Sequence, residues 1–409
     1  MRRYLLLIKC IPLLSLLASA SSLSAPKPLS ESLSAKSRRQ WLRQNALVLP
    51  FMGGTSLWKP KAAFASSKGA PSTVGMQDTS SPPLDVAYKT ITLSISEYGV
   101  EVPVACWFPT GGPSAPVPFR MRPKYRHRIS VRRIGELLAG WDFIPEFASR
   151  TFDFSPTTLS GSLRNGNSLD FQPGSRVIVL SHGFLGSRFD LSHIAEHLAS
   201  KGFVCVSPEY PESLAASYRR QAGLDRTVVN DALLKFVDST MKPSAYGVVG
   251  HSLGCGTALR IGDASWARVL IAGPPAPEDC PSPLLFISSM NDGLVQARGP
   301  IVLPSIYQRL QEGNFPKTIP RRAALIFDRL DAPNHISYLS ESVNDAMVSF
   351  LSPLLPVAQA MSIPVLDFDK YQISRDSQPT AAIIQPLISD FLVQQMAPTT
   401  DKGAEMEKV

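Results

Sequence analysis

The stretch that decides the fold is Tyr246-Gly247-Val248-Val249-Gly250-His251-Ser252-Leu253-Gly254. An apolar run comes first, and a serine with a glycine two residues away on either side follows it. A serine that must stand above the edge of a sheet needs a sharp turn from strand to helix, and the flanking glycines leave room for that turn. The pattern predicts that Ser252 is a nucleophile. The alternative is an ordinary turn in which Ser252 only caps the next helix.

The chain around this turn alternates short apolar runs with segments of helix length. Runs rich in Val, Ile and Leu between helices indicate the α/β class, with a mostly parallel central sheet and helices on both faces. Tyr88–Ser96 and Val102–Phe108 come earlier and predict two antiparallel strands. The expected parallel strands are Val177–Leu180, Phe203–Ser207, Tyr246–Val249, Val269–Ala272, Leu284–Ser288 and Ala323–Phe327, and the expected helices are Asp190–Ser200, Leu224–Met241 and Leu253–Ile261.

A serine hydroxyl is a weak nucleophile, so a histidine is needed to act as its general base. The chain has six histidines, and His335 lies in Asp331-Ala332-Pro333-Asn334-His335, directly after the last expected strand. A sheet of this kind brings that loop back over the serine. We therefore predict that His335 is the base; the alternative is a loop histidine without a role.

The other five histidines fit that role less well. His251 lies inside the serine turn and is expected to point away from the position that the serine faces. His193 and His197 are four residues apart on an expected helix, but no acid stands in the HExxH position and no third ligand is evident. We therefore expect both histidines either to face solvent or to pack in the core. His127 falls in an inserted segment, and His182 falls in the loop after the first parallel strand.

The acid that orients the imidazole is expected between the serine and the histidine in chain order. Asp292 is the first choice because it follows the expected strand Leu284–Ser288 and precedes a turn-forming glycine. Asp279, in the loop after the preceding strand, is the rival. Asp328 and Asp331 are close to His335 in sequence, and the alternative for them is that they are ordinary surface acids.

A tetrahedral oxyanion needs two backbone donors, and one comes from the residue after the serine, here Leu253. The other is expected from the loop Ser181-His182-Gly183-Phe184-Leu185-Gly186, which follows the first parallel strand. We assign the Phe184 N–H to this role, with Leu185 as the alternative. A plain glycine-containing turn in this loop would remove the assignment and leave the three catalytic candidates unchanged.

Residues 176–350 resemble the α/β-hydrolase fold. The stretches that carry the resemblance are Leu180-Ser181-His182-Gly183-Phe184-Leu185-Gly186-Ser187-Arg188, Leu198-Ala199-Ser200-Lys201-Gly202-Phe203-Val204 and Gly250-His251-Ser252-Leu253-Gly254. They look like the group of platelet-activating-factor acetylhydrolases, dienelactone-hydrolase-like proteins and chlorophyllases. The resemblance implies calcium-independent hydrolysis of carboxylic esters through an acyl-enzyme on Ser252. We expect neither a metal nor an organic cofactor.

The sequence departs from this group at two places. Acetylhydrolases and chlorophyllases carry the acid after the strand just beyond the serine helix, where this chain reads Ala272-Gly273-Pro274-Pro275. The acid is instead expected on the next strand, at Asp292, as in the wider superfamily. Chlorophyllases also usually carry arginine after the serine, where this chain has Leu253.

The expected function is that of a serine carboxylic ester hydrolase acting on an amphiphilic ester. A lipid acyl ester, the phytyl ester of chlorophyll and a small ester are all compatible with the sequence. Two alternatives stay open: an acyltransferase that uses the same acyl-enzyme, and a non-catalytic binding protein with the hydrolase fold. The oligomeric state is also left open.

The positive charge of the chain is concentrated at its N-terminus. The formal net charge of the 409 residues is +8, with 41 Lys and Arg against 33 Asp and Glu. Residues 1–65 hold ten of the bases and one acid, so the remainder has 31 bases against 32 acids. A basic body is the main support for nucleic-acid binding, and the sequence therefore argues against a nucleic-acid partner.

Residues 1–65 are expected to be a targeting leader. Met1–Ala20 has the layout of a secretory signal peptide, residues 21–37 have the composition of a transit segment, and residues 37–65, with Arg38-Arg39, look like a twin-arginine export signal. This order resembles the route into the thylakoid lumen of a complex plastid. The alternative is secretion through one signal peptide followed by a basic linker. Residues 66–83 predict a flexible lead-in.

The hydrolase domain is expected at 84–352 with an insertion at 114–175, followed by a C-terminal extension at 353–409 that includes a helix at Thr380–Gln395. The insertion has one helical stretch, Ile134–Leu138, and is either a lid or membrane contact or a solvated loop whose residues pack over the sheet. The sequence therefore leaves peripheral contact with a membrane open. Seven of its bases fall within fourteen residues, at Arg120, Arg122, Lys124, Arg126, Arg128, Arg132 and Arg133, and an apolar stretch with Leu137, Leu138, Trp141, Phe143, Ile144 and Phe147 follows them.

Overall fold

The computed structural model describes residues 84–110, 123–141, 143–145, 147, 149–156, 163–166, 172–296, 301–351 and 376–396. The leader and lead-in predicted for residues 1–83 lie outside the described residues, as do 352–375 and 397–409 of the predicted C-terminal extension. All the described residues belong to one unit, Pro82–Val409. Within these ranges, none of the helices combines the length and the apolar character that crossing a bilayer requires.

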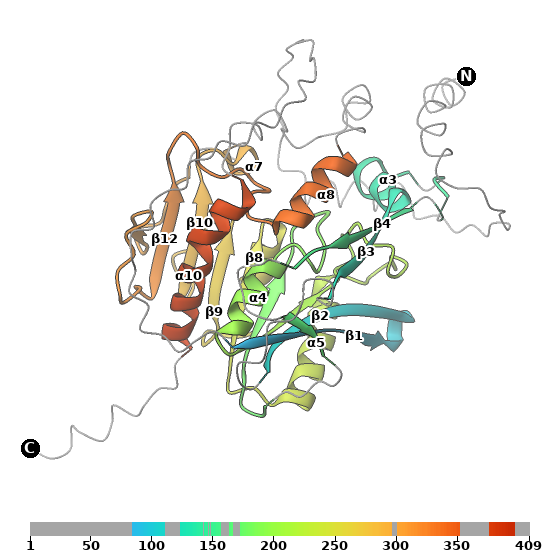
Figure 1. Ribbon diagram of the computed structural model, residues 1–409, viewed down its shortest axis with the longest axis horizontal. Helices are drawn as coiled ribbons and strands as arrows, with labels where there is room; N and C mark the ends of the chain where they lie inside the picture. The colour runs from blue at the N-terminus through green and yellow to red at the C-terminus, as the bar shows by residue number, and fades with distance from the viewer. Residues whose placement is uncertain are drawn as a thin grey trace, which may run out of the picture. The chain divides into compact units, whose positions relative to one another are not determined.

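One large sheet lies at the centre of the described structure (Figure 1). Its spatial order is β11-β12-β10-β9-β8-β6-β7-β2-β1-β5. β2 runs antiparallel to both β1 and β7, and the other pairings are parallel. The strands are β1 Asp85–Ile95, β2 Val100–Thr110, β5 Leu163–Asn165, β6 Arg176–Ser181, β7 Phe203–Pro208, β8 Ala245–His251, β9 Ala267–Ile271, β10 Leu284–Ser289, β11 Gln308–Leu310 and β12 Arg322–Phe327.

The order β1-β2-β7-β6-β8-β9-β10-β12, with an antiparallel second strand, is that of the α/β-hydrolase fold. The predicted fold class is therefore confirmed. The two flanking strands, β5 and β11, are three residues long each and were not expected from the sequence. The helices that accompany the sheet are α4 Ser192–Ser200, α5 Arg226–Met241, α6 Leu253–Ala258, α7 Gly293–Gln296, α8 Glu341–Leu351 and α10 Ser377–Gln395.

The central strands are buried on both faces, as their uninterrupted apolar runs predict. Successive side chains of a strand point to opposite faces, so Ile178 and Leu180 lie in one cluster of core residues and Val177 and Val179 lie in the other. The first cluster contains the apolar side chains of α4 and α10, and the second contains those of α5. Figure 1 shows α4 and α10 crossing the near face of the sheet.

The expected elements agree with the structure to within a few residues, and the differences have local causes. The helix expected at Leu253–Ile261 ends at Ala258, and Gly262 reverses the chain with φ 68° shortly after. The strand expected at Val269–Ala272 ends at Ile271 because Ala272 adopts φ 54°. The C-terminal helix begins at Ser377, three residues earlier than expected.

Part of the inserted segment forms a separate two-stranded sheet. β3 Tyr125–Ser130 pairs with β4 Ser149–Phe154, and α3 Val131–Ala139 lies between them in the chain. The α3 helix begins where the Ser130 hydroxyl accepts a hydrogen bond from the Arg133 N–H at 3.1 Å. Along β3 the side chains alternate, so that Tyr125, His127 and Ile129 are buried while the arginines between them are exposed. The sequence predicted the helix and missed the hairpin.

Tyr125 fixes this hairpin to the hydrolase domain. Its hydroxyl accepts a hydrogen bond from the indole N–H of Trp107 on β2 at 2.8 Å and donates one to the carboxylate of Glu196 on α4 at 2.7 Å. Its ring stacks on Phe189, with centroids 5.2 Å apart. The tyrosine is fully buried, so both hydrogen bonds form away from water, where losing one is costly.

Replacement of Tyr125 by phenylalanine is expected to lower the free energy of unfolding by about 1–3 kcal/mol, because the Trp107 N–H and the Glu196 carboxylate each lose this buried partner. Denaturant unfolding measures the change. Tyr98→Phe is the matched control, since its hydroxyl is exposed and donates to the Gly223 carbonyl at 3.3 Å; a change below about 0.5 kcal/mol is expected there. Equal losses in the two variants would contradict this account.

Candidate active site

Ser252 stands on a turn that ordinary residues avoid. β8 ends at His251 and α6 begins at Leu253, so the serine alone reverses the chain, with φ 56° and ψ −118°. Its N–H donates to the Ile271 carbonyl of β9 at 2.9 Å, which ties the turn to the sheet. Strain of this kind persists only where the surroundings hold it, and it lifts the side chain above the strand ends.

Two glycines make this turn possible by their lack of a side chain. A Cβ atom on Gly250 would collide with the Gly254 carbonyl oxygen, and a Cβ atom on Gly254 would collide with the Ser181 carbonyl oxygen at the end of β6. The first collision would force the turn open. The second would separate α6 from the strand that carries the next loop of the site.

The structure brings together the three side chains that the sequence singled out. The Ser252 hydroxyl lies 2.9 Å from Nε2 of His335, and Nδ1 of the same ring lies 2.9 Å from Oδ2 of Asp292. Because a carboxylate accepts, the Nδ1–H donates to Asp292 and leaves Nε2 as the acceptor for the serine. Asp292 is fully buried, His335 is 7% exposed and Ser252 is partly exposed. The three side chains thus lead from the buried carboxylate of Asp292, through His335, to the partly exposed hydroxyl of Ser252.

The loops that carry Asp292 and His335 are joined by a neighbouring side chain. The amide of Asn291 donates to the Leu330 and Ala332 carbonyls at 2.9 and 3.0 Å. This links the loop after β10 to the loop after β12, three residues before the histidine. Asp292 is also held from its own side, since its Oδ1 accepts from the Val295 N–H of α7 at 3.1 Å.

The rival acids lie elsewhere. Asp279 is exposed on the segment after β9. Asp328 forms an ion pair with Arg309 at 2.7 Å, and Asp331 lies 3.8 Å from Arg329. The acid that the structure places beside His335 is therefore Asp292 and none of these three.

The loop after β6 approaches the serine closely. A Cβ atom on Gly183 would lie 3.1 Å from Cβ of Ser252, a tight contact, so the absence of a side chain at Gly183 helps the backbone to come this near. The Leu185 N–H donates to the Glu212 carbonyl at 3.2 Å and is therefore engaged. The geometry favours Phe184 over Leu185 as a donor to the site. Leu253 is the first residue of α6, where backbone N–H groups have no partner within the helix.

Buried side chains that sequence analysis did not identify hold this loop. Nδ1 of His182 donates to the Gly183 carbonyl at 2.8 Å, and Nε2 accepts from the Tyr210 N–H at 3.1 Å. Arg226, at the start of α5, donates to the His182 and Gly183 carbonyls at 2.9 and 3.3 Å. Burial lowers the pKa of His182 to about 3, which keeps it neutral and able to accept. No pattern in the sequence marks Arg226 for this position.

Behind the same loop lies a buried ion pair. Arg188 and Glu209 are 2.5 Å apart, and Glu209 is fully buried. Burial alone would raise the pKa of Glu209, but Arg188, His127, His182 and a hydrogen bond from Ser213 together lower it. His127 of β3 lies 3.9 Å from the same carboxylate, and burial lowers its pKa to about 4. This cluster connects the inserted hairpin to the loop that faces the serine.

His251 is closer to the site than the sequence suggested. It was expected to point away from the position that the serine faces. Its Nε2–H donates to the His335 carbonyl at 3.0 Å, and the centroids of the two rings lie 4.9 Å apart. Burial lowers the pKa of His251 to about 3, so it stays neutral. His251 therefore supports the backbone of His335 through this hydrogen bond.

The two histidines of α4 are packing residues, which is one of the two possibilities that the sequence left open. His193 is buried, and neither ring nitrogen has a hydrogen-bond partner. His197 lies 3.2 Å from the Ser389 hydroxyl of α10. Over the described ranges, no group of three or more His, Cys, Asp or Glu side chains is arranged to hold a metal ion.

Comparison with known proteins gives likeness of fold alone. No family model matches the sequence, and no curated protein matches it. Among solved structures, a ferulic acid esterase from Streptomyces cinnamoneus is 15% identical over 77% of this chain and 91% of its own, with a TM-score of 0.41. A dienelactone hydrolase from Anabaena variabilis is 14% identical over 66% and 97%, with a TM-score of 0.33. A Pyrococcus furiosus esterase is 10% identical over 76% and 91%, with a TM-score of 0.35.

Gly254→Ala is expected to destabilise the protein by several kcal/mol, because the new methyl group would overlap the backbone of β6. Thermal and denaturant unfolding measure the change. Gly256→Ala is the matched control on the same helix, since its Cβ would meet only the flexible Arg260 side chain at 3.6 Å. Alanine there is expected to be neutral or stabilising by up to about 1 kcal/mol. A tolerated Gly254→Ala would contradict the packing described above.

His193→Leu is expected to make stability less dependent on pH. Burial lowers the folded-state pKa of His193 to about 3, against 6.5 for an ordinary histidine. Between these values the unfolded chain binds the additional proton, so wild-type stability falls as the pH drops below about 6.5. The advantage of leucine should grow by on the order of 1 kcal/mol per pH unit. Urea unfolding at pH 7, 6 and 5 tests this; parallel pH curves for the two proteins would refute it.

Proposed function

We propose that this protein is a serine hydrolase of carboxylic esters that works through an acyl-enzyme on Ser252. The observation that carries the proposal is the hydrogen-bonded series Ser252–His335–Asp292, with both distances 2.9 Å, on a turn that exposes the serine. A base within hydrogen-bond reach of a hydroxyl, itself oriented by a carboxylate, is the arrangement that activates a serine.

The proposed reaction has two halves. Oγ of Ser252 attacks the ester carbonyl carbon while Nε2 of His335 takes the hydroxyl proton, and the imidazolium then gives that proton to the departing alcohol. In the second half His335 takes a proton from water as the water oxygen attacks the acyl-enzyme carbonyl. The imidazolium then returns that proton to Oγ of Ser252 as the acyl–serine bond breaks, which releases the acid and restores the free enzyme. Asp292 holds the Nδ1–H of the ring throughout and stabilises the imidazolium.

The negative charge that develops on the carbonyl oxygen is assigned to two backbone donors. These are the N–H groups of Leu253, at the start of α6, and Phe184, in the loop after β6. The contact between Gly183 and Ser252 supports this assignment, because it puts the loop beside the attacked carbon. Hydrogen bonds from His182 and Arg226 fix the loop in advance, and a donor needs such preorganisation to favour the transition state.

An amphiphilic substrate is the best-supported class. Three exposed apolar side chains lie on the loops that carry the proposed catalytic groups: Phe184 is 36% exposed, Met290 is 40% exposed and Leu330 is 96% exposed. Apolar groups around a polar reaction centre suit an ester with a long hydrocarbon part. A lipid acyl ester and the phytyl ester of chlorophyll both meet this description. The export signals expected in residues 1–65 favour substrates found in plastid membranes.

Ser252→Ala is expected to abolish labelling by a fluorophosphonate and to lower esterase activity by ~10⁴-fold or more, because the nucleophile is removed. The measurement uses the full chain with p-nitrophenyl esters, a short-acyl phospholipid, a galactolipid and chlorophyll a. Product formation that rises with an alcohol acceptor would favour acyl transfer. Absence of labelling in the wild-type protein would sink the hydrolase proposal and favour a binding protein.

The acid is tested by a matched pair of substitutions. Asp292→Asn leaves the shape unchanged and removes the charge that orients His335, so kcat should fall by roughly 10⁴-fold. Asp279→Asn, at an exposed position, should leave kcat near that of the wild type. The reverse result would assign the acid to Asp279.

A further inference from the structure

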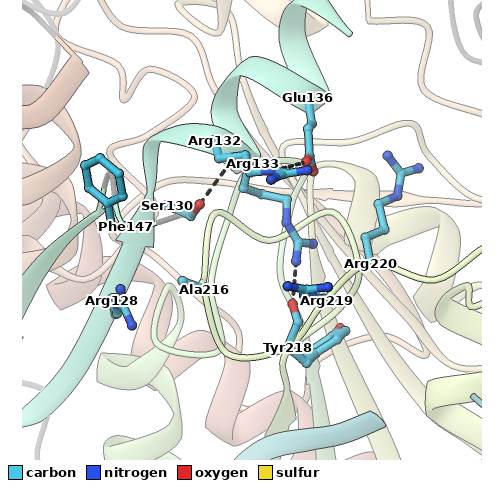
Figure 2. A pocket seen from close by; sticks show the side chains of 10 residues that line it. All are labelled: Arg128, Ser130, Arg132, Arg133, Glu136, Phe147, Ala216, Tyr218, Arg219 and Arg220. Carbon is cyan, nitrogen blue, oxygen red and sulfur yellow. Dashed lines mark hydrogen bonds and ion pairs between the residues drawn. The ribbon is translucent and has the colours of Figure 1, made fainter. Parts of the chain in front are cut away.

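A cavity of about 530 Å³ opens beside the inserted hairpin (Figure 2). It lies between β3, α3 and the segment that follows β7. Figure 2 shows Arg128 and Phe147 at one side of the pocket and Arg219 and Arg220 at the other. The described residues that line it are Arg128, Ser130, Arg132, Arg133, Glu136, Phe147, Ala216, Tyr218, Arg219 and Arg220.

The lining is strongly positive. Among the described residues of the wall there are five arginines and one acid, Glu136, an excess of four positive charges. Glu136 accepts a hydrogen bond from Nε of Arg132 at 2.6 Å, so its charge is already shared with one arginine of the wall. Like charges gathered in a cavity repel each other, and an anion bound among them relieves that repulsion.

Arg133 shows that part of this charge is built into the fold. Its side chain is 6% exposed, and its two terminal nitrogens donate to the Pro211 and Tyr218 carbonyls at 2.8 and 2.6 Å. Carbonyl oxygens orient a guanidinium without neutralising it. Burial lowers the pKa of Arg133, Tyr218 and Glu136 oppose this shift, and the positive charge of Arg220 adds to it.

Two exposed arginines of β3 contact other residues of the hairpin. Nε of Arg126 lies 3.2 Å from the Asp153 carboxylate across the hairpin, outside the pocket. Nε of Arg128 donates to the Ser149 hydroxyl at 2.7 Å, and Arg128 also lines the pocket. The five arginines of the wall lie around a concave site of ligand size, since small-molecule pockets commonly measure about 300–1,000 Å³.

The pocket is also connected to the loop that faces Ser252. The Ser130 N–H donates to the Leu214 carbonyl and the Ala216 N–H donates to the Arg128 carbonyl, both at 2.8 Å. On the other side of the same segment, the Leu214 N–H donates to the Gly186 carbonyl at 3.4 Å. Residues 214–216 thus separate the arginine pocket from the loop at 183–186 by one stretch of backbone.

We infer that this pocket binds the phosphate group of an organic phosphate. Guanidinium groups match the oxygens of phosphate in pairs, and a dianion reduces the excess charge more than a single carboxylate does. Phe147, which is 61% exposed at the rim, offers an apolar contact to the organic part of the ligand. The site goes beyond the proposed ester chemistry and does not depend on it. The phosphate belongs either to a soluble compound or to the headgroup of an anionic lipid.

The test measures binding to the full chain with inorganic phosphate and glycerol 3-phosphate by calorimetry, and with phosphatidic acid vesicles against phosphatidylcholine vesicles by sedimentation. The variant Arg219→Gln with Arg220→Gln should weaken binding about tenfold to a hundredfold, because two charged donors are lost. Arg220→Lys keeps the charge and removes the planar fork, so a smaller loss is expected. Circular dichroism checks that each variant is folded.

A second double variant provides the matched control. Lys235→Gln with Arg260→Gln removes the same charge from exposed positions on α5 and after α6, and it should bind as the wild type does. Saturable binding of glycerol 3-phosphate that only the pocket variants lose supports a soluble ligand. Binding of phosphatidic acid vesicles alone, lost in the same variants, supports a lipid headgroup. Absence of both, or equal losses in the control, would overturn the proposal. Ser252→Ala should bind phosphate normally, so failure of the ester chemistry leaves this test intact.

Discussion

The rest of the site depends on one close contact between backbones. Gly254 lies directly against the Ser181 carbonyl, where no side chain would fit, and this contact sets the distance between α6 and the end of β6. It lets Ser252 adopt its positive φ and brings the loop at 183–186 beside the serine. The α/β sheet provides the edge at which these pieces meet, and the two glycines of the turn allow them to approach.

Around this contact, polar side chains in the interior hold the loops of the site in place. His182, Arg226 and Asn291 each hydrogen-bond to backbone carbonyls of loops that reach the site. Buried polar groups are costly when they lack partners, so a satisfied network of this kind resists alternative loop positions. Such rigidity is what a hydroxyl needs to stay in line with its base and with the proposed oxyanion donors.

The inserted segment adds a second polar surface to the same edge of the fold. Tyr125 anchors it through two buried hydrogen bonds, and the alternation along β3 sends its arginines outward. One sequence pattern therefore has two consequences: the inward residues complete the core beside Phe189, and one of the outward arginines, Arg128, contributes to the arginine-lined cavity. The sequence suggested a lid, a membrane contact or a solvated loop, and the fold adds a concave site that none of these described.

The sequence by itself determined the sheet, the serine turn and the loops in which a base and an acid were to be sought. This was feasible because strands β6 to β10 are continuous apolar runs and because the carboxyl ends of parallel strands meet at one edge. Strands β5 and β11 are too short to leave such a pattern, and the hairpin of the insertion was hidden among basic residues. The tertiary structure alone decided that Asp292 and not Asp279 meets His335, that His251 supports the histidine, and that five arginines share a cavity. Each of these depends on loops from distant parts of the chain crossing at one place, and local sequence does not encode that crossing.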